Sequence, residues 1–334
     1  MTDNPRIIGE RSGSQHGPLL IVLTQVHGNE PAGYLALKEV FKRIDEEYNH
    51  KPYFDYRGKI VGLIGNLRAS QDKVRYINTD LNRLWTDENV SRIMKSDKGN
   101  LNISEEKELH EILQTINTYI ENYEPKHVVI LDLHTTTAQG GIFIIPSKEE
   151  KSRQLGLNIH APILHGFLDD LQGTVLHHFN NKNYPNLNLT SLCFESGQHN
   201  SRESVDHAVS AIIQCFMAMG GFYPEDIETK HEQLLTQDSA KLPKEAQLIY
   251  SHRIAPGDEI KMRGDLIYAN FDPVTKGELL AHDRHGEIRA KFDGLILMPL
   301  YQKQGNDGFF IIKDINRDAP KLHQKIPTTT LNAI

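Results

Sequence analysis

Two groups that can bind a metal ion, His27 and Glu30, stand in the stretch TQVHGNEPAG, residues 24–33. An imidazole and a carboxylate three positions apart on a turn can reach the same cation. Both groups are costly to bury without a partner, yet they directly follow the aliphatic run 19–23. An H-x-x-E pair arises about once by chance in a histidine-rich chain, so a metal site needs further ligands.

A second histidine, His134, ends the apolar stretch VVILDLHTTT. Residues at the carboxyl ends of two strands in one sheet can converge, so His27, Glu30 and His134 would form a His₂Glu set with an open fourth position. This set is typical of hydrolytic zinc sites. Asp132 does not belong to the set but could orient one of the metal-binding side chains. A core histidine satisfied by backbone groups is the alternative for His134.

A third stretch, SLCFESGQH, places Glu195 at the end of a strand-like run. Water activated by a metal needs a nearby carboxylate that accepts its proton and passes it to the leaving nitrogen. Glu195 is the candidate for this general base. The alternative is a glutamate that faces solvent at the end of a strand.

Arginines are concentrated in GNLRASQDKVRYINTDLNRLW, residues 65–85. A guanidinium offers a bidentate fork to a carboxylate, or a positive charge near a developing oxyanion. An amidase with an anionic substrate needs both functions. The alternative is that these arginines are solvated, with Arg83 paired to Asp80 or Asp87 at the surface.

Strand-like and helix-like segments alternate up to about residue 222, which predicts a mixed α/β domain. The helices are expected over residues 104–123 and around residues 205–216, the second ending at Gly220 and Gly221. Strands are expected at the following runs: 19–23, 59–65, 128–133, 141–146 and 189–194.

The polar segment 223–245 has no sustained apolar stripe and is expected to be a linker. Short β-like runs separated by Gly, Asp and Pro follow it, which predicts an all-β module. These runs are AQLIYSHRI, DLIYANF, ELLAH and DGLILMPL.

The composition describes a globular protein of 334 residues, with 38% hydrophobic and 24% charged residues. A net charge of -7 and the lack of a basic stripe argue against nucleic acid as a partner, and no apolar run is long enough to span a membrane. The N-terminus shows no secretory signal. Cys193 and Cys215 have no partner at a metal-type spacing, and we expect buried thiols in a reducing cytoplasm.

In this order, the motifs HGNEPAG, NLRA, RYINTDLNR, DLHTTT and FESG resemble the aspartoacylase/succinylglutamate desuccinylase family of zinc carboxypeptidase-like enzymes. The resemblance covers about residues 18–200. It implies an α/β fold with a zinc carboxypeptidase-like mixed sheet flanked by helices, followed by a smaller all-β domain. The implied division is a zinc-dependent amidohydrolase domain over 1–230 and a barrel-sandwich-like β domain over 231–334 that partly covers the active site.

The resemblance also implies a role for each motif residue. One zinc ion per chain would be held by three ligands, which are His27, Glu30 and His134. Glu195 looks like the general base, and Arg68 looks like the residue that polarises the scissile carbonyl. Asn82 and Arg83 look like the pair that grips a substrate carboxylate.

The expected function is zinc-dependent hydrolysis of the amide bond of a small anionic N-acyl amino acid in the cytoplasm. The products are a carboxylic acid and a free amino acid, and the enzyme could act as a homo-oligomer. Two alternatives stay open: a metallocarboxypeptidase acting on short peptides, and a catalytically silent zinc-stabilised binding protein.

Two departures from the family pattern leave the substrate unnamed. Aspartoacylases hold a second substrate carboxylate with an arginine shortly before the base glutamate, and no arginine occurs here between Arg153 and Arg202. The family's C-terminal domain also lends a tyrosine to the site, where the comparable stretch here reads NDGFFIIKD.

Overall fold

Four parallel strands form the centre of the sheet in the computed structural model, which describes residues 4–51, 53–255 and 257–316. They lie in the order β3, β2, β4, β7, with the bounds Arg57–Ile64, Gln15–Thr24, His127–Thr136 and Asn188–Gln198. Apolar side chains cover both faces of these strands, as the continuous aliphatic runs predict. The carboxyl ends of β2, β4 and β7 meet at one edge, where ligand sites of such sheets lie.

The remaining strands extend this sheet on both sides to eleven strands, in the order β1-β3-β2-β4-β7-β5-β6-β8-β14-β13-β10. Antiparallel pairs at β1, β5 and β14 make the sheet mixed. The added strands are β1 (Ile7–Ser12), β5 (Phe143–Pro146), β6 (Ile163–His165), β8 (Glu245–Arg253), β10 (Pro273–Val274), β13 (Gly294–Leu297) and β14 (Asp307–Asp314).

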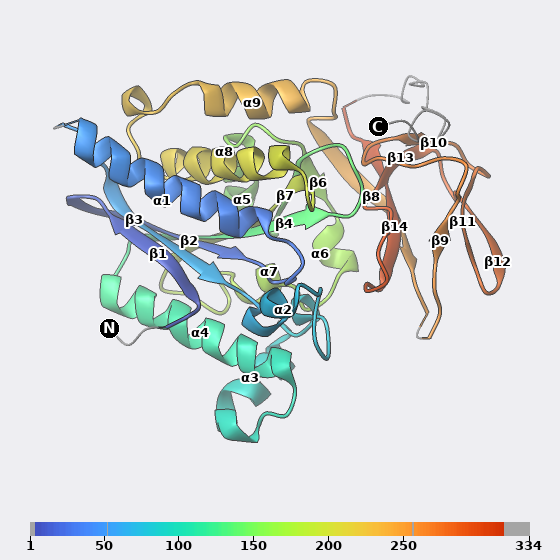
Figure 1. Cartoon of the computed structure of the whole chain (residues 1–334), viewed down its shortest axis with the longest axis horizontal. Coiled ribbons are helices and arrows are strands. Elements are labelled where there is room, and N and C mark those ends of the chain that lie inside the picture. The colour runs from blue at the N-terminus through green and yellow to red at the C-terminus, as the bar shows by residue number, and fades with distance from the viewer. Residues whose placement is uncertain (1–3, 52, 256, 317–334) are drawn as a thin grey trace.

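Helices cover the two faces of the sheet (Figure 1). One face packs against α1 (Ala32–His50), α5 (Glu150–Leu157) and α8 (Arg202–Ala218), with α9 (Lys230–Ser239) outside them. The other face packs against α4 (Ser104–Tyr123), with α3 (Asp87–Lys95) beside it. Short helices are α2 (Leu67–Asp72), α6 (Phe167–Asp170), α7 (Val175–His178), η1 (Leu81–Arg83), η2 (Lys98–Asn100) and η3 (Pro224–Asp226).

A second, three-stranded antiparallel sheet lies near the C-terminal end of the described chain (Figure 1). Its strands are β9 (Lys261–Met262), β11 (Leu279–Asp283) and β12 (Gly286–Arg289). A separate apolar cluster around Leu280, Ile288 and Phe309 supports it. The predicted fold class, a mixed α/β sheet followed by a smaller β part, is confirmed.

Two local predictions were wrong. The expected linker 223–245 contains α9, whose His231 and Leu235 are buried. Residues 265–271, expected to be a strand, form turns and irregular structure, with Tyr268 fully buried. The division at residues 230 and 231 stays a prediction. Within the described ranges, no helix is both long and apolar enough to cross a membrane.

Candidate functional site

The turn between β2 and α1 carries His27 and Glu30. A Cβ on Gly28 would lie 2.1 Å from the backbone carbon of Ala69, so only glycine lets the turn pack this closely on α2. The amide of Gly28 donates to the carbonyl of Arg75 at 3.1 Å, which ties the turn to the next loop. The sequence therefore fixes the turn by packing and by a backbone hydrogen bond.

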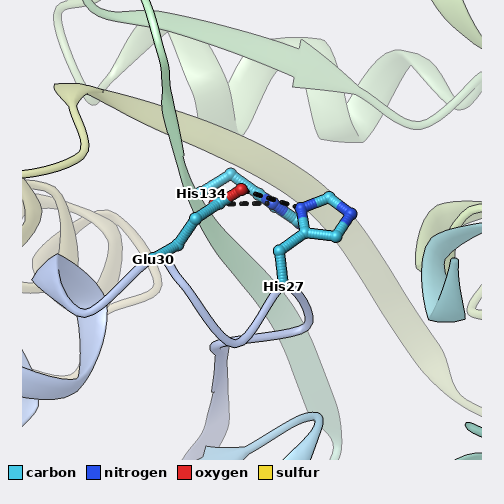
Figure 2. A group of neighbouring side chains, drawn as sticks. All are labelled: His27, Glu30 and His134. Atoms are coloured by element: carbon cyan, nitrogen blue, oxygen red, sulfur yellow. Dashed lines mark hydrogen bonds and ion pairs between the residues drawn. The ribbon is translucent and has the colours of Figure 1, made fainter. Parts of the chain in front are cut away.

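Figure 2 shows Glu30 lying between two imidazoles. Its Oε1 is 2.8 Å from His27 Nδ1, its Oε2 is 3.2 Å from His134 Nδ1, and the Thr135 amide donates to Oε2 at 2.8 Å. All three side chains are buried, and one ligand atom from each lies within 4.8 Å of the others. The strand-end convergence that the sequence predicts is thus present.

Each histidine also faces a second carboxylate. His27 Nε2 lies 3.1 Å from Asp80 Oδ1, and His134 Nε2 lies 3.0 Å from Asp132 Oδ2. Outer carboxylates of this kind fix the ring orientation of metal-binding histidines. Asp132 is therefore in a position to orient the His134 ring, and Asp80 is in the equivalent position beside His27.

The charges around the two imidazoles fit a divalent cation. Three buried carboxylates, Glu30, Asp80 and Asp132, lie around the imidazoles, and one guanidinium, that of Arg75, pairs with Glu30 and Asp80. With both imidazoles neutral, these four groups carry two net negative charges. Burial opposes a charge on His134, but Asp132 and Glu30 outweigh it and raise the pKa of this histidine well above its usual value. A metal ion can take the place of the proton that such a cluster attracts.

A second group, Asp132, His134 and Cys193, also has its ligand atoms within 4.8 Å of one another. Burial raises the pKa of the Cys193 thiol well above its usual value, so forming the thiolate that binds a metal costs more here than at an exposed cysteine. Of the two groups, the one with Glu30 is the better metal site.

Glu195 lies beside this cluster on β7, paired in register with His134 on β4. Its side chain is buried, and its Oε2 makes no hydrogen bond within the described part of the chain. Burial raises the pKa of Glu195 to about 8, with Glu30 adding to this rise and His134 opposing it. A carboxyl group with such a pKa can both accept and donate a proton near neutral pH.

The three arginines of residues 65–85 lie in different environments. Arg68 is 64% exposed, pairs with Asp72 at 3.1 Å and does not line the pocket. Arg75 is 14% exposed and lines the pocket, with Nη2 at 2.9 Å from Asp80 and Nη1 at 3.8 Å from Glu30. The assignment of the carbonyl-polarising role to Arg68 is therefore corrected, and Arg75 is the arginine that lies beside the predicted metal ligand Glu30.

The predicted carboxylate pair, Asn82 and Arg83, lines the same pocket. Asn82 Oδ1 accepts from the amide of Val175 at 3.0 Å, which leaves its Nδ2 group as the donor for a ligand. Arg83 donates through Nη2 to Asp307 Oδ2 at 2.5 Å and through Nη1 to the Asn82 carbonyl at 2.6 Å. Arg83 thus pairs with Asp307 rather than with Asp80 or Asp87, the two aspartates considered from the sequence.

The pocket is a partly open cleft with about 870 Å³ of empty space, open solvent included, and its cover comes from the far end of the chain. Met298, Leu300 and Gln302 follow β13, and Asp307 and Phe310 belong to β14. The stretch NDGFFIIKD contributes Asn306, Asp307 and Phe310 to the pocket, and no tyrosine occurs among the described residues that line it.

Comparison with known proteins identifies the N-terminal half of the chain. Residues 16–178 match the succinylglutamate desuccinylase/aspartoacylase catalytic domain. This stretch of the chain is similar to that catalytic domain. The aspartoacylase of Xenopus tropicalis is 32% identical over 131 residues, 39% of this chain and 38% of the relative, and a probable aspartoacylase of Nostoc sp. is 32% identical over 124 residues, 37% of each chain. The match thus spans less than two fifths of either curated relative.

Solved structures share the fold over most of the chain. A succinylglutamate desuccinylase/aspartoacylase from Rhodobacter sphaeroides has a TM-score of 0.60 at 15% identity, covering 90% of this chain and 87% of its own. The product-bound ectoine utilization protein EutE (DoeB) from Ruegeria pomeroyi has a TM-score of 0.59 at 17% identity, covering 90% and 86%. At these identities the likeness shows the fold alone.

The sequence interpretation missed two residues of the site, Arg75 and Asp80. Both belong to RYINTDLNR, the motif that had singled out Asn82 and Arg83. The signal was therefore present, but the spacing alone does not say which arginine of the region turns inward.

Proposed function

We propose that the chain is a zinc-dependent hydrolase that cleaves the amide bond of an N-acyl amino acid into a carboxylic acid and a free amino acid. The observation that carries the proposal is the position of Glu195, a buried carboxyl group with a raised pKa beside the His27, Glu30 and His134 set. Simple metal binding has no use for an acid-base group at this place.

The three ligands would hold one zinc ion, in agreement with their chemistry and with the negative charge around them. Bound there, zinc supplies Lewis acidity to a carbonyl group and to water. Glu195 accepts a proton from the attacking water and delivers it to the amide nitrogen as the C–N bond breaks. One water is consumed: its hydroxyl group goes to the carboxylic acid and its proton to the amine of the amino acid.

Two guanidinium groups would serve the substrate. Arg75 places positive charge beside the metal ligands, where an oxyanion develops on the scissile carbonyl. Arg83 and the Nδ2 group of Asn82 would hold the α-carboxylate, which fixes the amide bond relative to Glu195. The buried thiols of Cys193 and Cys215 agree with the expected cytoplasmic location.

The cover of the pocket favours a small substrate over a peptide. Residues of β14 and of the segment after β13 line the pocket beside the predicted metal ligands, which suits a ligand of amino acid size. A carboxypeptidase needs further open space for the rest of its peptide. The geometry therefore supports the deacylase better than the metallocarboxypeptidase.

Metal analysis combined with kinetics tests the proposal. We expect purified wild type to hold about one equivalent of zinc, to lose hydrolysis of N-acyl amino acids on chelation and to regain it with zinc. His134→Ala should hold less than about a tenth of an equivalent, while His127→Ala, at the start of the same strand and outside the pocket, should bind zinc as wild type does. Full activity without metal, or cleavage of short peptides alone, would reject it.

A further inference from the structure

One wall of the pocket is apolar. It is formed by side chains from β5, α6, the segment after α6, α7 and β14, which are Ile145, Leu168, Leu171, Leu176 and Phe310. All but Leu171 are buried members of the main apolar core, and Leu171 packs against it. The wall is therefore a rigid part of the fold that presents hydrocarbon to the pocket.

The arginines that line the pocket already form ion pairs with acidic side chains of the protein. Among the described residues that line it, Arg75 and Arg83 are the only arginines, and no lysine is present. Arg75 pairs with Asp80 and Glu30, and Arg83 pairs with Asp307. A ligand with one carboxylate can share Arg83, but a second carboxylate would meet no further arginine and no lysine among the described lining residues. It would meet hydrocarbon, the protein's own acids and uncharged polar groups such as Thr174 and Gln302. Burying a charge without a partner is strongly unfavourable.

The apolar wall lies next to the carboxylate anchor. The amide of Val175 donates to Asn82 Oδ1 at 3.0 Å, and the amide of Trp85 donates to the carbonyl of Gly173 at 3.1 Å. A Cβ on Gly173 would lie 2.3 Å from the carbonyl oxygen of Arg83. The segment with Leu171 and Leu176 is thus docked on the anchor itself.

This adjacency indicates which part of the substrate meets the wall. In an α-amino acid, the side chain and the carboxylate are attached to the same carbon atom. When Asn82 and Arg83 hold the carboxylate, the surface beside them faces the side chain. That surface includes Leu171 and Leu176.

We propose that the amino acid half of the substrate has an apolar side chain, of the methionine, leucine or phenylalanine class, and that acidic N-acyl amino acids are disfavoured. The inference rests on the proposed function, because it assumes the carboxylate anchor at Asn82 and Arg83. It adds the substrate class and names the wall of Leu171 and Leu176 as the determinant of specificity.

Binding of N-acyl amino acids to a variant that hydrolyses them slowly tests the substrate class directly. Zinc-loaded Glu195→Gln should bind N-acetyl-L-methionine at least about tenfold more tightly than N-acetyl-L-aspartate in calorimetric titrations, since burying a side chain of this size is worth about this much or more. Equal affinities, or tighter binding of the aspartate compound, overturn the inference. Wild-type hydrolysis of the same two compounds separates the claims. Cleavage with a preference for aspartate keeps the proposed function and rejects the substrate class. Selective binding of N-acetyl-L-methionine without any cleavage keeps the substrate class and rejects the proposed function.

A charge placed on the wall supplies the second test. Leu171→Arg adds a cation at a partly exposed position beside the anchor, and Leu157→Arg adds one at an exposed position of α5 outside the pocket. The methionine-to-aspartate ratio of kcat/KM should fall at least about tenfold in Leu171→Arg and stay as in wild type in Leu157→Arg. An unchanged ratio in a folded Leu171→Arg would show that the wall does not meet the side chain. If this variant fails to fold, the titrations still decide.

Discussion

Replacing Glu105 by glutamine would test how the loop with Arg75 and Asp80 is held. Glu105 is buried on α4, and its Oε1 accepts from the Ile77 amide at 2.7 Å and from Asn66 Nδ2 at 3.1 Å. Its Oε2 accepts from the amides of Asn78 and Thr79 at 3.1 and 3.2 Å. The carboxylate thus fixes three consecutive backbone groups between the two site residues.

Glutamine cannot reproduce this pattern. Either orientation of its amide puts an NH₂ group against two donors, so at least two hydrogen bonds are lost. Hydrogen bonds to a charged group are worth about 1.5–3 kcal/mol each. Relaxation of the loop recovers part of this, and we expect the free energy of unfolding of Glu105→Gln to fall by about 3 kcal/mol. At about 2–4 °C per kcal/mol, the Tm should fall by about 6–12 °C.

Activity should fall as well, because displacing a site group by about 1 Å can cost on the order of 100-fold. Thermal unfolding and kcat/KM on one N-acyl amino acid measure both effects. Glu121→Gln, at an exposed position of the same helix, is the control and should leave both values unchanged. Wild-type Tm and kcat/KM in Glu105→Gln would refute the claim that this carboxylate holds the loop.

Three further substitutions have expected outcomes. Arg75→Ala should lower kcat/KM by on the order of 100-fold, whereas Arg68→Ala should stay within about twofold of wild type, and equal losses in steady-state assays would contradict the site geometry. Gly28→Ala should lower the Tm by several degrees because its Cβ would lie 2.1 Å from the backbone of α2, while Gly264→Ala, with open space around it, should not; matching melting curves would count against this packing. Arg83→Ala should reduce kcat/KM at least about tenfold on a substrate with a free carboxylate, and an equal reduction on the amidated substrate would show that the anchor is misassigned.

Much of the central sheet could be predicted because its strands are buried on both faces. The runs 19–23, 128–133 and 189–194 lie inside β2, β4 and β7, and the helix over 104–123 has the bounds expected. Once these strands are parallel neighbours, their carboxyl ends must meet. The convergence of His27, Glu30 and His134 follows from strand order and needed no further information.

The side-chain environment of arginines could not be predicted in this way. Arg68 lies on α2 and points to solvent, and Arg75 follows the left-handed residue Lys73, which ends that helix, and turns inward. Both stand in equally polar sequence, so local pattern does not distinguish them. The direction of the chain after a turn depends on packing against elements far away in sequence, here the pairing with Asp80 and the Gly28 amide.

The C-terminal region was harder still. Its short strands read as a separate β module, but β8, β14, β13 and β10 continue the main sheet, and Asp307 of β14 reaches Arg83. Strand pairing between distant segments is set by tertiary contacts and not by local propensity. The same holds for α9, whose buried face has two residues in a polar sequence.

Zinc content and turnover of Glu195→Gln, measured on the same preparation, decide whether Glu195 is the acid-base group of a zinc hydrolase. The variant should hold about one equivalent of zinc, as wild type does, because Glu195 is not one of the three ligands. Its kcat on N-acyl amino acids should fall at least about 100-fold, because the group that moves the proton is lost. Turnover at the wild-type rate with zinc bound would contradict this role of Glu195.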